Sequence, residues 1–152
     1  MDSENPTDDF LSEPVYTIGH AAEKLGVAVP TIRMYEQAGL ILPYRTKTNR
    51  RLYSRTDIHR IEVIIDLIRN YGLNLESIRR LCSLIPCWQI TQCSEEMRNG
   101  CPAYNDSNNP CWVEENTNCR KEGLDCRRCK VYIDCPQSWK NPKEFLKSFF
   151  KN

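Results

Sequence analysis

The sequence predicts a mainly α-helical protein, in which a helix-turn-helix with a small two-stranded wing precedes an irregular cysteine-rich module. Three observations indicate this fold class. Apolar residues recur at helical spacing on both sides of a glycine between Tyr16 and Leu40. A basic stretch with turn-forming residues follows at 41–54. All nine cysteines lie between Cys82 and Cys135, so the second half of the chain differs in chemistry from the first.

The first two helices are predicted within residues 16–40. The apolar face of the first helix repeats at i, i+3, i+4 and i+7, and consists of Ile18, Ala21, Ala22 and Leu25. Gly26 then suits the left-handed conformation that ends many helices. The second helix is expected to begin near Val29, because Pro30 is tolerated in a first turn, where amides need no intrahelical partner. Two helices with such a short connection form a helix-turn-helix, whose second helix fits the major groove of DNA.

The stretch at 41–54 predicts a basic hairpin. Tyr44-Arg45 and Arg51-Leu52-Tyr53 are expected to pair as short strands, and Asn49 between them tolerates a left-handed turn conformation. Residues 14–85 carry eleven bases and six acids. The excess positive charge therefore lies in the half that is predicted to contact phosphates.

Two longer helices follow the hairpin. A capping box at Ser54 begins a helix that runs to about Asn70, with isoleucines at helical spacing on one face. Asn74 is expected to cap a fourth helix that runs to Ile85. Cys82 stands in the apolar stripe of that helix, so we interpret it as a buried core cysteine rather than a ligand.

Three runs, in this order, resemble the winged helix-turn-helix of the MerR family of bacterial transcription regulators: YTIGHAAEKLGV, TIRMYEQAGLI and NRRLYSRTDIHRI. The resemblance covers about residues 16–85. It implies a regulator that binds double-stranded promoter DNA and acts with RNA polymerase. Carried over to this sequence, it implies DNA contacts from the second helix and the wing, made by Thr31, Arg33, Tyr35, Arg45, Lys47, Arg50, Arg51 and Tyr53.

The cysteine-rich region contains an internal repeat. The pattern PCW…C…CxxY occurs over residues 86–104 and again over residues 110–132. The second copy adds Cys126 and is followed by Cys135. The corresponding cysteines are Cys87 and Cys111, Cys93 and Cys119, and Cys101 and Cys129. The repeat is similar to small bacterial modules with paired Cys-Trp motifs.

Thiolates at this density predict a metal site, because they are the soft ligands that hold zinc or iron–sulfur clusters. Residues 87–135 contain few apolar side chains, so bound metal would supply folding energy that burial cannot. The irregular spacing and two Cys-Pro dipeptides favour an iron–sulfur cluster, while zinc, disulfides or free thiols stay open as alternatives. The predicted ligands are Cys87, Cys93, Cys101, Cys111, Cys119, Cys126, Cys129 and Cys135.

The sequence therefore divides into three parts. Residues 1–13 carry five acids and no base, and are expected to be a disordered tail. Residues 14–85 form the DNA-binding domain, and residues 86–152 form the cysteine module with a short C-terminal helix. No apolar run is long enough to span a membrane, and residues 1–10 do not resemble a secretory signal, so we expect a cytoplasmic protein.

We predict a sensor-linked transcription regulator and not an enzyme, since no catalytic residues are indicated. Two other classes stay open: a redox or electron-transfer component with an iron–sulfur module, and a structural DNA-binding adaptor stabilised by zinc. The helix expected from Asn141 is too short for the long antiparallel coiled coil that joins most MerR-family dimers. A homodimer is therefore left open, and the tail could instead cover the cysteine module.

Overall fold

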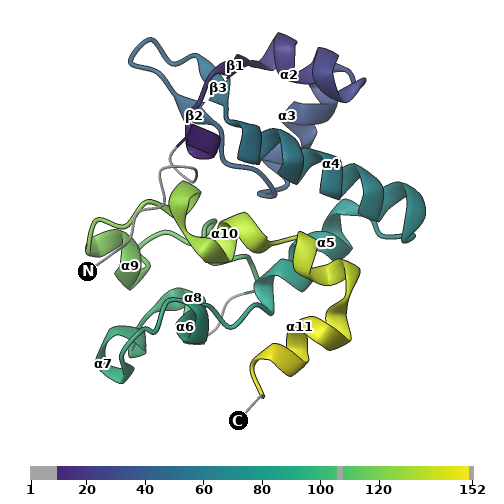
Figure 1. Ribbon diagram of the computed structural model, residues 1–152. Coiled ribbons are helices and arrows are strands. Elements are labelled where there is room, and N and C mark those ends of the chain that lie inside the picture. Colours follow the sequence, from purple (N-terminus) through teal and green to yellow (C-terminus); the bar gives the residue numbers. More distant parts are fainter. Residues whose placement is uncertain (1–9, 106–107, 151–152) are drawn as a thin grey trace.

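The computed structural model describes residues 10–105 and 108–150, and it is mainly helical with a small sheet (Figure 1). The first region contains β1 (Tyr16–Thr17), α2 (Ile18–Leu25), α3 (Val29–Gln37), β2 (Tyr44–Arg45), β3 (Arg51–Tyr53), α4 (Arg55–Asn70) and α5 (Leu75–Ser83). The cysteine-rich region contains α6 (Cys87–Ile90), α7 (Glu95–Arg98), α8 (Pro102–Asn105), α9 (Asn118–Lys121), η1 (Cys126–Arg128), α10 (Lys130–Asp134), η2 (Gln137–Lys140) and α11 (Pro142–Ser148). In Figure 1 the sheet, α2 and α3 lie above α4, and the cysteine-rich region lies below it.

The helix ends follow rules that the local sequence contains. Gly26 ends α2 with φ 64°, in the left-handed region where glycine is favoured. Ser54 begins α4 with a capping box, and the Asn74 side chain accepts a hydrogen bond from the Ser77 amide at the start of α5. The four predicted helices are confirmed, although α5 ends before the predicted Ile85.

The predicted hairpin is also confirmed, and the sheet has one strand more than we expected. β2 and β3 pair antiparallel, with Tyr44 opposite Leu52, and Asn49 has φ 61° in the turn. β1 pairs with the other edge of β3, which gives the strand order β1-β3-β2. A two-residue strand has no periodicity to reveal it in a sequence. It joins the start of α2 directly to the wing.

Only part of the predicted N-terminal tail can be compared with the structure, because residues 1–9 lie outside the described residues. Residues 10–12 are helical. The Arg55 guanidinium lies 4.3 Å from the Phe10 ring centroid, and the Thr56 hydroxyl donates to the Leu11 carbonyl at 3.1 Å. The described end of the tail therefore contacts the start of α4.

The C-terminal helix packs on its own chain. α11 begins next to the predicted Asn141, and its Phe145 ring lies 5.2 Å from the Trp139 ring in an edge-to-face arrangement. Both residues belong to the tail, so this contact lies within it, and covering of the cysteine module and homodimerisation both stay predictions. Within the residues that the structure describes, no helix combines the length and the apolar character needed to cross a membrane.

One hydrophobic core joins the two regions. It includes Ile61, Ile64 and Leu67 from α4, Ile78 and Cys82 from α5, and Trp112, Val131, Tyr132, Cys135 and Trp139 from the cysteine-rich region. The division into a DNA-binding domain at 14–85 and a cysteine module at 86–152 stays a prediction, and any separation of the two would expose this shared surface to water.

A methyl group at Gly39 should test how tightly the two regions fit. Gly39 has φ 75°, and a Cβ added there would lie 2.8 Å from Val113 Cγ2. At Gly26, φ is 64° and no atom lies within 4 Å of the added Cβ. Both alanine variants are expected to lose about 1 kcal/mol from backbone strain. Gly39→Ala should lose measurably more than Gly26→Ala in urea-induced unfolding, and equal losses would contradict the tight contact.

Candidate nucleic-acid interface

The recognition helix, α3, presents a polar face to solvent because its apolar side chains are turned toward the core. Ile32 is fully buried and Pro30 sets the first turn. Arg33 and Met34 are exposed on the open face, and Thr31 is half-buried beside them. Arg33 is therefore the one predicted base-reading cation of this helix that lies free at the surface.

A carboxylate on the recognition helix holds the wing in place. The Glu36 side chain accepts hydrogen bonds from Arg51 Nε at 2.8 Å and from Arg45 Nη2 at 3.2 Å. Arg45 also donates to Asn49 Oδ1 at 3.2 Å, which ties the turn of the hairpin to its strand. The two arginines therefore have a structural role in addition to any contact with phosphates.

The wing also carries cations that are open to solvent. Lys47 and Arg50 are exposed on the turn between β2 and β3, and neither forms an ion pair with another residue in the described part of the chain. Unpaired cations on a protruding turn are suited to phosphate oxygens, which fix the position of a protein on DNA without reading its sequence.

Two predicted DNA contacts are corrected by the structure. Tyr35 and Tyr53 are 5% and 0% exposed, and both belong to the hydrophobic core. Burial, followed by the nearby Glu36 carboxylate, raises the pKa of Tyr53 to about 12. An aromatic ring in a basic motif is equally suited to a core that supports the wing. Sequence pattern alone could not distinguish these roles.

The most consequential polar residue, Arg60, was absent from the predicted set. It is 2% exposed, in the middle of α4. Its guanidinium lies 3.9 Å from the Tyr132 ring centroid and 4.9 Å from the Trp112 ring centroid. It donates to the carbonyl oxygens of Leu40, at 2.6 Å, and of Tyr132. A buried cation is costly unless it is compensated. Here two carbonyls satisfy Nε and Nη1 and two aromatic faces cover the group, while Nη2 has no hydrogen-bond partner among the described residues.

A second contact pairs charges from the two regions next to Arg60. Arg127 Nη2 donates to Asp57 Oδ2 at 2.8 Å, and Arg127 Nη1 donates to the Leu42 carbonyl at 2.9 Å. The Leu42 amide in turn donates to the Tyr132 hydroxyl at 2.8 Å. Because Asp57 also completes the capping box of α4, a single carboxylate serves both the helix start and the contact between regions.

The cysteine module also contacts the end of the recognition helix directly. Trp112 is 1% exposed, and its indole N–H donates to the Gly39 carbonyl at 2.7 Å. Gly39 lies two residues after the last residue of α3. The second Cys-Trp repeat therefore fixes the backbone just after the helix that is predicted to read DNA.

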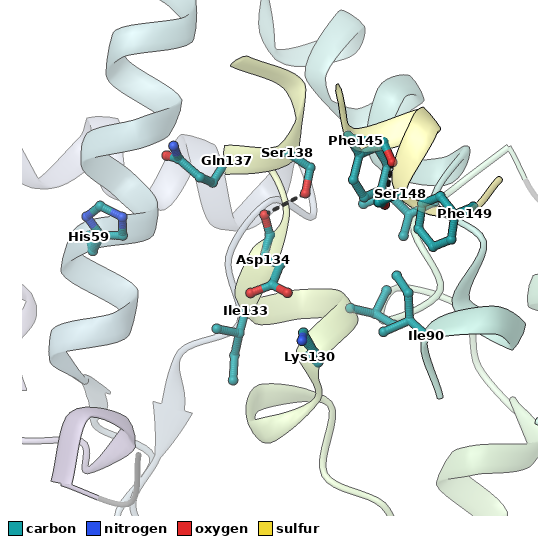
Figure 2. Close-up of a pocket in the computed structure, with 12 residues that line it drawn as sticks. His59, Ile90, Lys130, Ile133, Asp134, Gln137, Ser138, Phe145, Ser148 and Phe149 are labelled. Atoms are coloured by element: carbon teal, nitrogen blue, oxygen red, sulfur yellow. Dashed lines mark hydrogen bonds between the residues drawn. The ribbon is translucent and has the colours of Figure 1, made fainter. Parts of the chain in front are cut away.

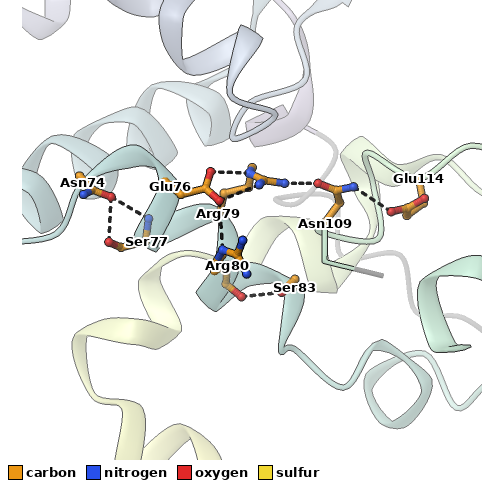
Figure 3. Close-up of polar contacts among 8 residues, drawn as sticks. All are labelled: Asn74, Glu76, Ser77, Arg79, Arg80, Ser83, Asn109 and Glu114. Carbon is orange, nitrogen blue, oxygen red and sulfur yellow. Dashed lines mark hydrogen bonds and ion pairs between the residues drawn. The ribbon is translucent and has the colours of Figure 1, made fainter. Parts of the chain in front are cut away.

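Another link joins α5 to the segment between the two repeats (Figure 3). Arg79 donates to Glu76 on its own helix and to the Asn109 side chain, which donates to Glu114 at 3.1 Å. Figure 3 shows this as a continuous row of side chains from α5 to the cysteine module. The start of the second repeat is thus anchored to the first region from two sides.

The predicted metal-ligating cysteines do not form one compact group. The first cysteines of the two repeats are partners: a hydrogen bond with the Cys111 thiol lowers the pKa of Cys87 to about 7, and the pKa of Cys111 is raised. Burial raises the pKa of Cys129, and neighbouring Cys126 and Cys119 add to this effect. These five thiols, Cys87, Cys111, Cys119, Cys126 and Cys129, therefore lie in one neighbourhood.

The other cysteines border this neighbourhood. Cys135 is fully buried and hydrogen-bonds with Cys82, the cysteine that we interpreted as a core residue, and it also lies close enough to Cys111 to interact electrostatically. Burial raises the pKa of Cys93, the Arg98 guanidinium lowers it, and Cys101, Cys87 and Cys119 raise it further. Among the residues that the structure describes, which include all nine cysteines, no three cysteine, histidine, aspartate or glutamate side chains are grouped as metal ligands.

A cavity lies beside the cysteine module, away from the recognition helix (Figure 2). Its volume is about 590 Å³. Figure 2 shows apolar side chains from α6, α10 and α11 on its walls, including Ile90, Ile133 and Phe145, with His59 at the side formed by α4. No feature of its lining connects it with the DNA-facing surface.

Comparison with known proteins identifies the first region. The family model described as MerR HTH family regulatory protein matches residues 16–85. Residues 16–85 form a MerR-family helix-turn-helix domain. Similar relatives include HspR of Streptomyces coelicolor, 36% identical over 80 residues that make up 53% of each chain. The transcriptional regulator GlnR of Bacillus cereus is 36% identical over 74 residues, 49% of this chain and 57% of that protein.

A third relative, the transcriptional regulator HmrR of Rhizobium leguminosarum, is 39% identical over 67 residues, 44% of this chain and 51% of that protein. The chain thus spans about half the length of the curated relatives that it matches. The matched family region ends at Ile85, directly before the first Cys-Trp repeat. The MerR-family domain is therefore joined to its cysteine module without an intervening linker.

The Glu36 contacts predict unequal effects of two wing arginines on DNA binding. Arg50→Ala should weaken binding to all sequences and reduce the slope of log affinity against log salt by about one. Arg51→Ala should weaken binding more, because it also leaves the Glu36 carboxylate with Arg45 as its remaining cationic partner, so that its negative charge would repel phosphates more strongly. Adding Glu36→Gln to Arg51→Ala should recover part of the loss. Salt titrations of duplex binding would test this, and equal losses without recovery would contradict it.

Arg60 should be sensitive even to a change that keeps its charge. A lysine cannot reproduce the planar fork that donates to two carbonyls between two rings. We expect Arg60→Lys to lower the free energy of unfolding by about 1–3 kcal/mol. Arg69→Lys on the exposed face of the same helix is the matched control, and it should change stability by less than about 0.5 kcal/mol. Indistinguishable denaturation midpoints for the two variants would show that the fork is not needed.

Proposed function

We propose that this protein is a cytoplasmic transcription regulator that binds promoter DNA through its MerR-family domain, acts with RNA polymerase, and changes its DNA affinity with the redox state or metal occupancy of its cysteine module. One observation carries the proposal. The Trp112 indole N–H donates to the Gly39 carbonyl at 2.7 Å, so the module holds the exit of the recognition helix. A change in the module has a direct route to the DNA-reading surface.

The DNA-binding part of the proposal is supported by the surface chemistry of the domain. Arg33 on α3 and Lys47 and Arg50 on the wing are all exposed. Their placement combines one candidate contact with base edges and two with the phosphate backbone. GlnR and HmrR, which match the same domain, are each named an HTH-type transcriptional regulator.

The sensing part rests on the thiols that surround Trp112. Cys87, Cys111, Cys126 and Cys129 fit best as ligands because they occupy one neighbourhood, with Cys119 adjacent. We propose an iron–sulfur cluster as the first choice and zinc as the alternative. A cluster changes its charge on oxidation, whereas zinc holds thiolates without redox chemistry of its own. In either case, binding must draw the thiols into a closer group.

Such a rearrangement would act on residues that are already shared with the MerR-family domain. Cys111 precedes Trp112, and Cys129 lies three residues before Tyr132, whose hydroxyl accepts from the Leu42 amide. A shift of either aromatic residue therefore alters the backbone between α3 and β2. Coupling between two such sites typically amounts to about 1–3 kcal/mol.

The proposal predicts that anaerobically purified, oxidised and metal-free forms of the full chain bind a promoter fragment with affinities that differ by about 5- to 150-fold. Metal and sulfide analysis of the same preparation distinguishes an iron–sulfur cluster from zinc. Equal affinities in all three forms would show that the metal only stabilises the fold. If none of the three forms bound DNA, the proposal that the protein is a DNA-binding regulator would itself be wrong.

A matched pair of tryptophan variants tests whether the hydrogen bond from Trp112 to Gly39 transmits the change from the cysteine module to the MerR-family domain. Trp112→Phe keeps an aromatic ring but loses the hydrogen bond to Gly39, so it should retain metal and reduce the difference between the forms. Trp139 is also buried, with 7% exposure compared with 1% for Trp112, and its indole nitrogen has no hydrogen-bond partner among the described residues. Trp139→Phe should therefore leave the difference between forms unchanged. The same response from both variants would exclude the Trp112 contact as the route.

A further inference from the structure

The two Cys-Trp repeats build the same aromatic pair. In the second repeat, the Trp112 and Tyr132 ring centroids are 5.3 Å apart with an interplanar angle of 81°. In the first repeat, the Trp88 and Tyr104 ring centroids are 5.0 Å apart with an interplanar angle of 89°. These tryptophans and tyrosines stand at corresponding positions of the repeated sequence. Each repeat therefore forms an edge-to-face pair of the same shape.

The pair of the second repeat shows what this arrangement binds. Its rings enclose the Arg60 guanidinium of α4, at 3.9 and 4.9 Å from their centroids. The Trp112 indole N–H donates to a backbone carbonyl, and the Tyr132 hydroxyl accepts from a backbone amide. The pair therefore contacts an arginine side chain with its rings and hydrogen-bonds to backbone groups at Gly39 and Leu42.

No guanidinium is enclosed between the two rings of the first repeat in the way that Arg60 is enclosed in the second. Tyr104 is 40% exposed, compared with 1% for Tyr132, and Trp88 is half-buried. Neither the Trp88 indole nor the Tyr104 hydroxyl has a hydrogen-bond partner among the residues that the structure describes. In Figure 1, α6 and α8, which carry these residues, lie on the side of the cysteine module opposite the MerR-family domain.

The nearest cation of the same repeat does not fill this place. The Arg98 guanidinium lies 5.7 Å from the Tyr104 ring centroid, near the limit for a cation–π contact. Its Nη2 donates to the Cys93 carbonyl at 2.9 Å, which holds it at the rim of the pair. Two exposed acids on α7, Glu95 and Glu96, add negative charge to the repeat.

We propose that the first Cys-Trp repeat is a docking surface for an arginine side chain that a partner protein presents on a helix. The second repeat already binds a helix in this way, and the acids of α7 complement a cationic partner. A second copy of this chain could not present Arg60 to this surface, because Arg60 and its face of α4 are already occupied within each copy. The docking surface consists of Trp88, Tyr104, Glu95 and Glu96.

The test uses the full chain with ¹⁵N-labelled tryptophan, whose three residues give separate indole N–H signals in an NMR spectrum. The probe is a synthetic peptide with the sequence of residues 55–70, which contains Arg60. The matched control peptide carries citrulline in place of that arginine, so it keeps the shape and loses the charge. Saturable movement of the Trp88 signal is expected, with the Trp112 signal unmoved and the control peptide binding about tenfold more weakly.

Tyr104→Ala should abolish the response while leaving the Trp112 and Trp139 signals in place, which shows that the fold is intact. Absence of movement at millimolar peptide would overturn the proposal and assign Arg98 as the only cation of this pair. Equal binding of the citrulline peptide would overturn the arginine requirement. Movement of the Trp88 signal on concentrating the protein alone would overturn the choice of partner, because a second copy would then be the occupant.

Discussion

The structure depends on one buried cation. Arg60 lies within the apolar face of α4, where an uncompensated charge would cost several kcal/mol. The MerR-family domain supplies only one of its hydrogen-bond acceptors, the Leu40 carbonyl. The other acceptor, and both aromatic rings that cover the guanidinium, come from the second Cys-Trp repeat. The domain therefore carries a side chain whose burial requires the cysteine module, and the two regions are stable in contact for this reason.

The aromatic residues that bury Arg60 are neighbours of cysteines in the sequence. Trp112 follows Cys111 directly, and Tyr132 lies between Cys129 and Cys135. Each of the two rings that hold Arg60 therefore belongs to a residue that is close in sequence to a cysteine. Under the proposed function, ligation or oxidation that moved those cysteine thiols would change the environment of the buried cation. Because this cation also contacts the loop after α3, part of the free energy of such an event would be coupled to the predicted DNA-binding surface.

The features that the sequence predicted are those set by neighbours along the chain. Gly26, Ser54 and Asn74 end or begin helices through local hydrogen bonds and backbone preferences, so their roles could be anticipated. The burial of Tyr35 and Tyr53 and the Arg60 contacts depend on residues distant in sequence. One signal was available, since Arg60 shares a face of α4 with Ile61 and Ile64 at helical spacing. The cysteine partners were not predictable, because irregular spacing fixes no geometry.

The contacts of Glu36 determine what a shift of that loop would do. Glu36 on α3 holds Arg45 and Arg51 of the wing, with Arg51 Nε only 2.8 Å from its carboxylate. The recognition helix and the wing are therefore held together as one unit. The second repeat holds this unit at Gly39 and Leu42, near the point where helix and wing join. A displacement at that point would rotate the base-reading and phosphate-binding groups together, so it would change the fit to DNA as a whole and not a single contact.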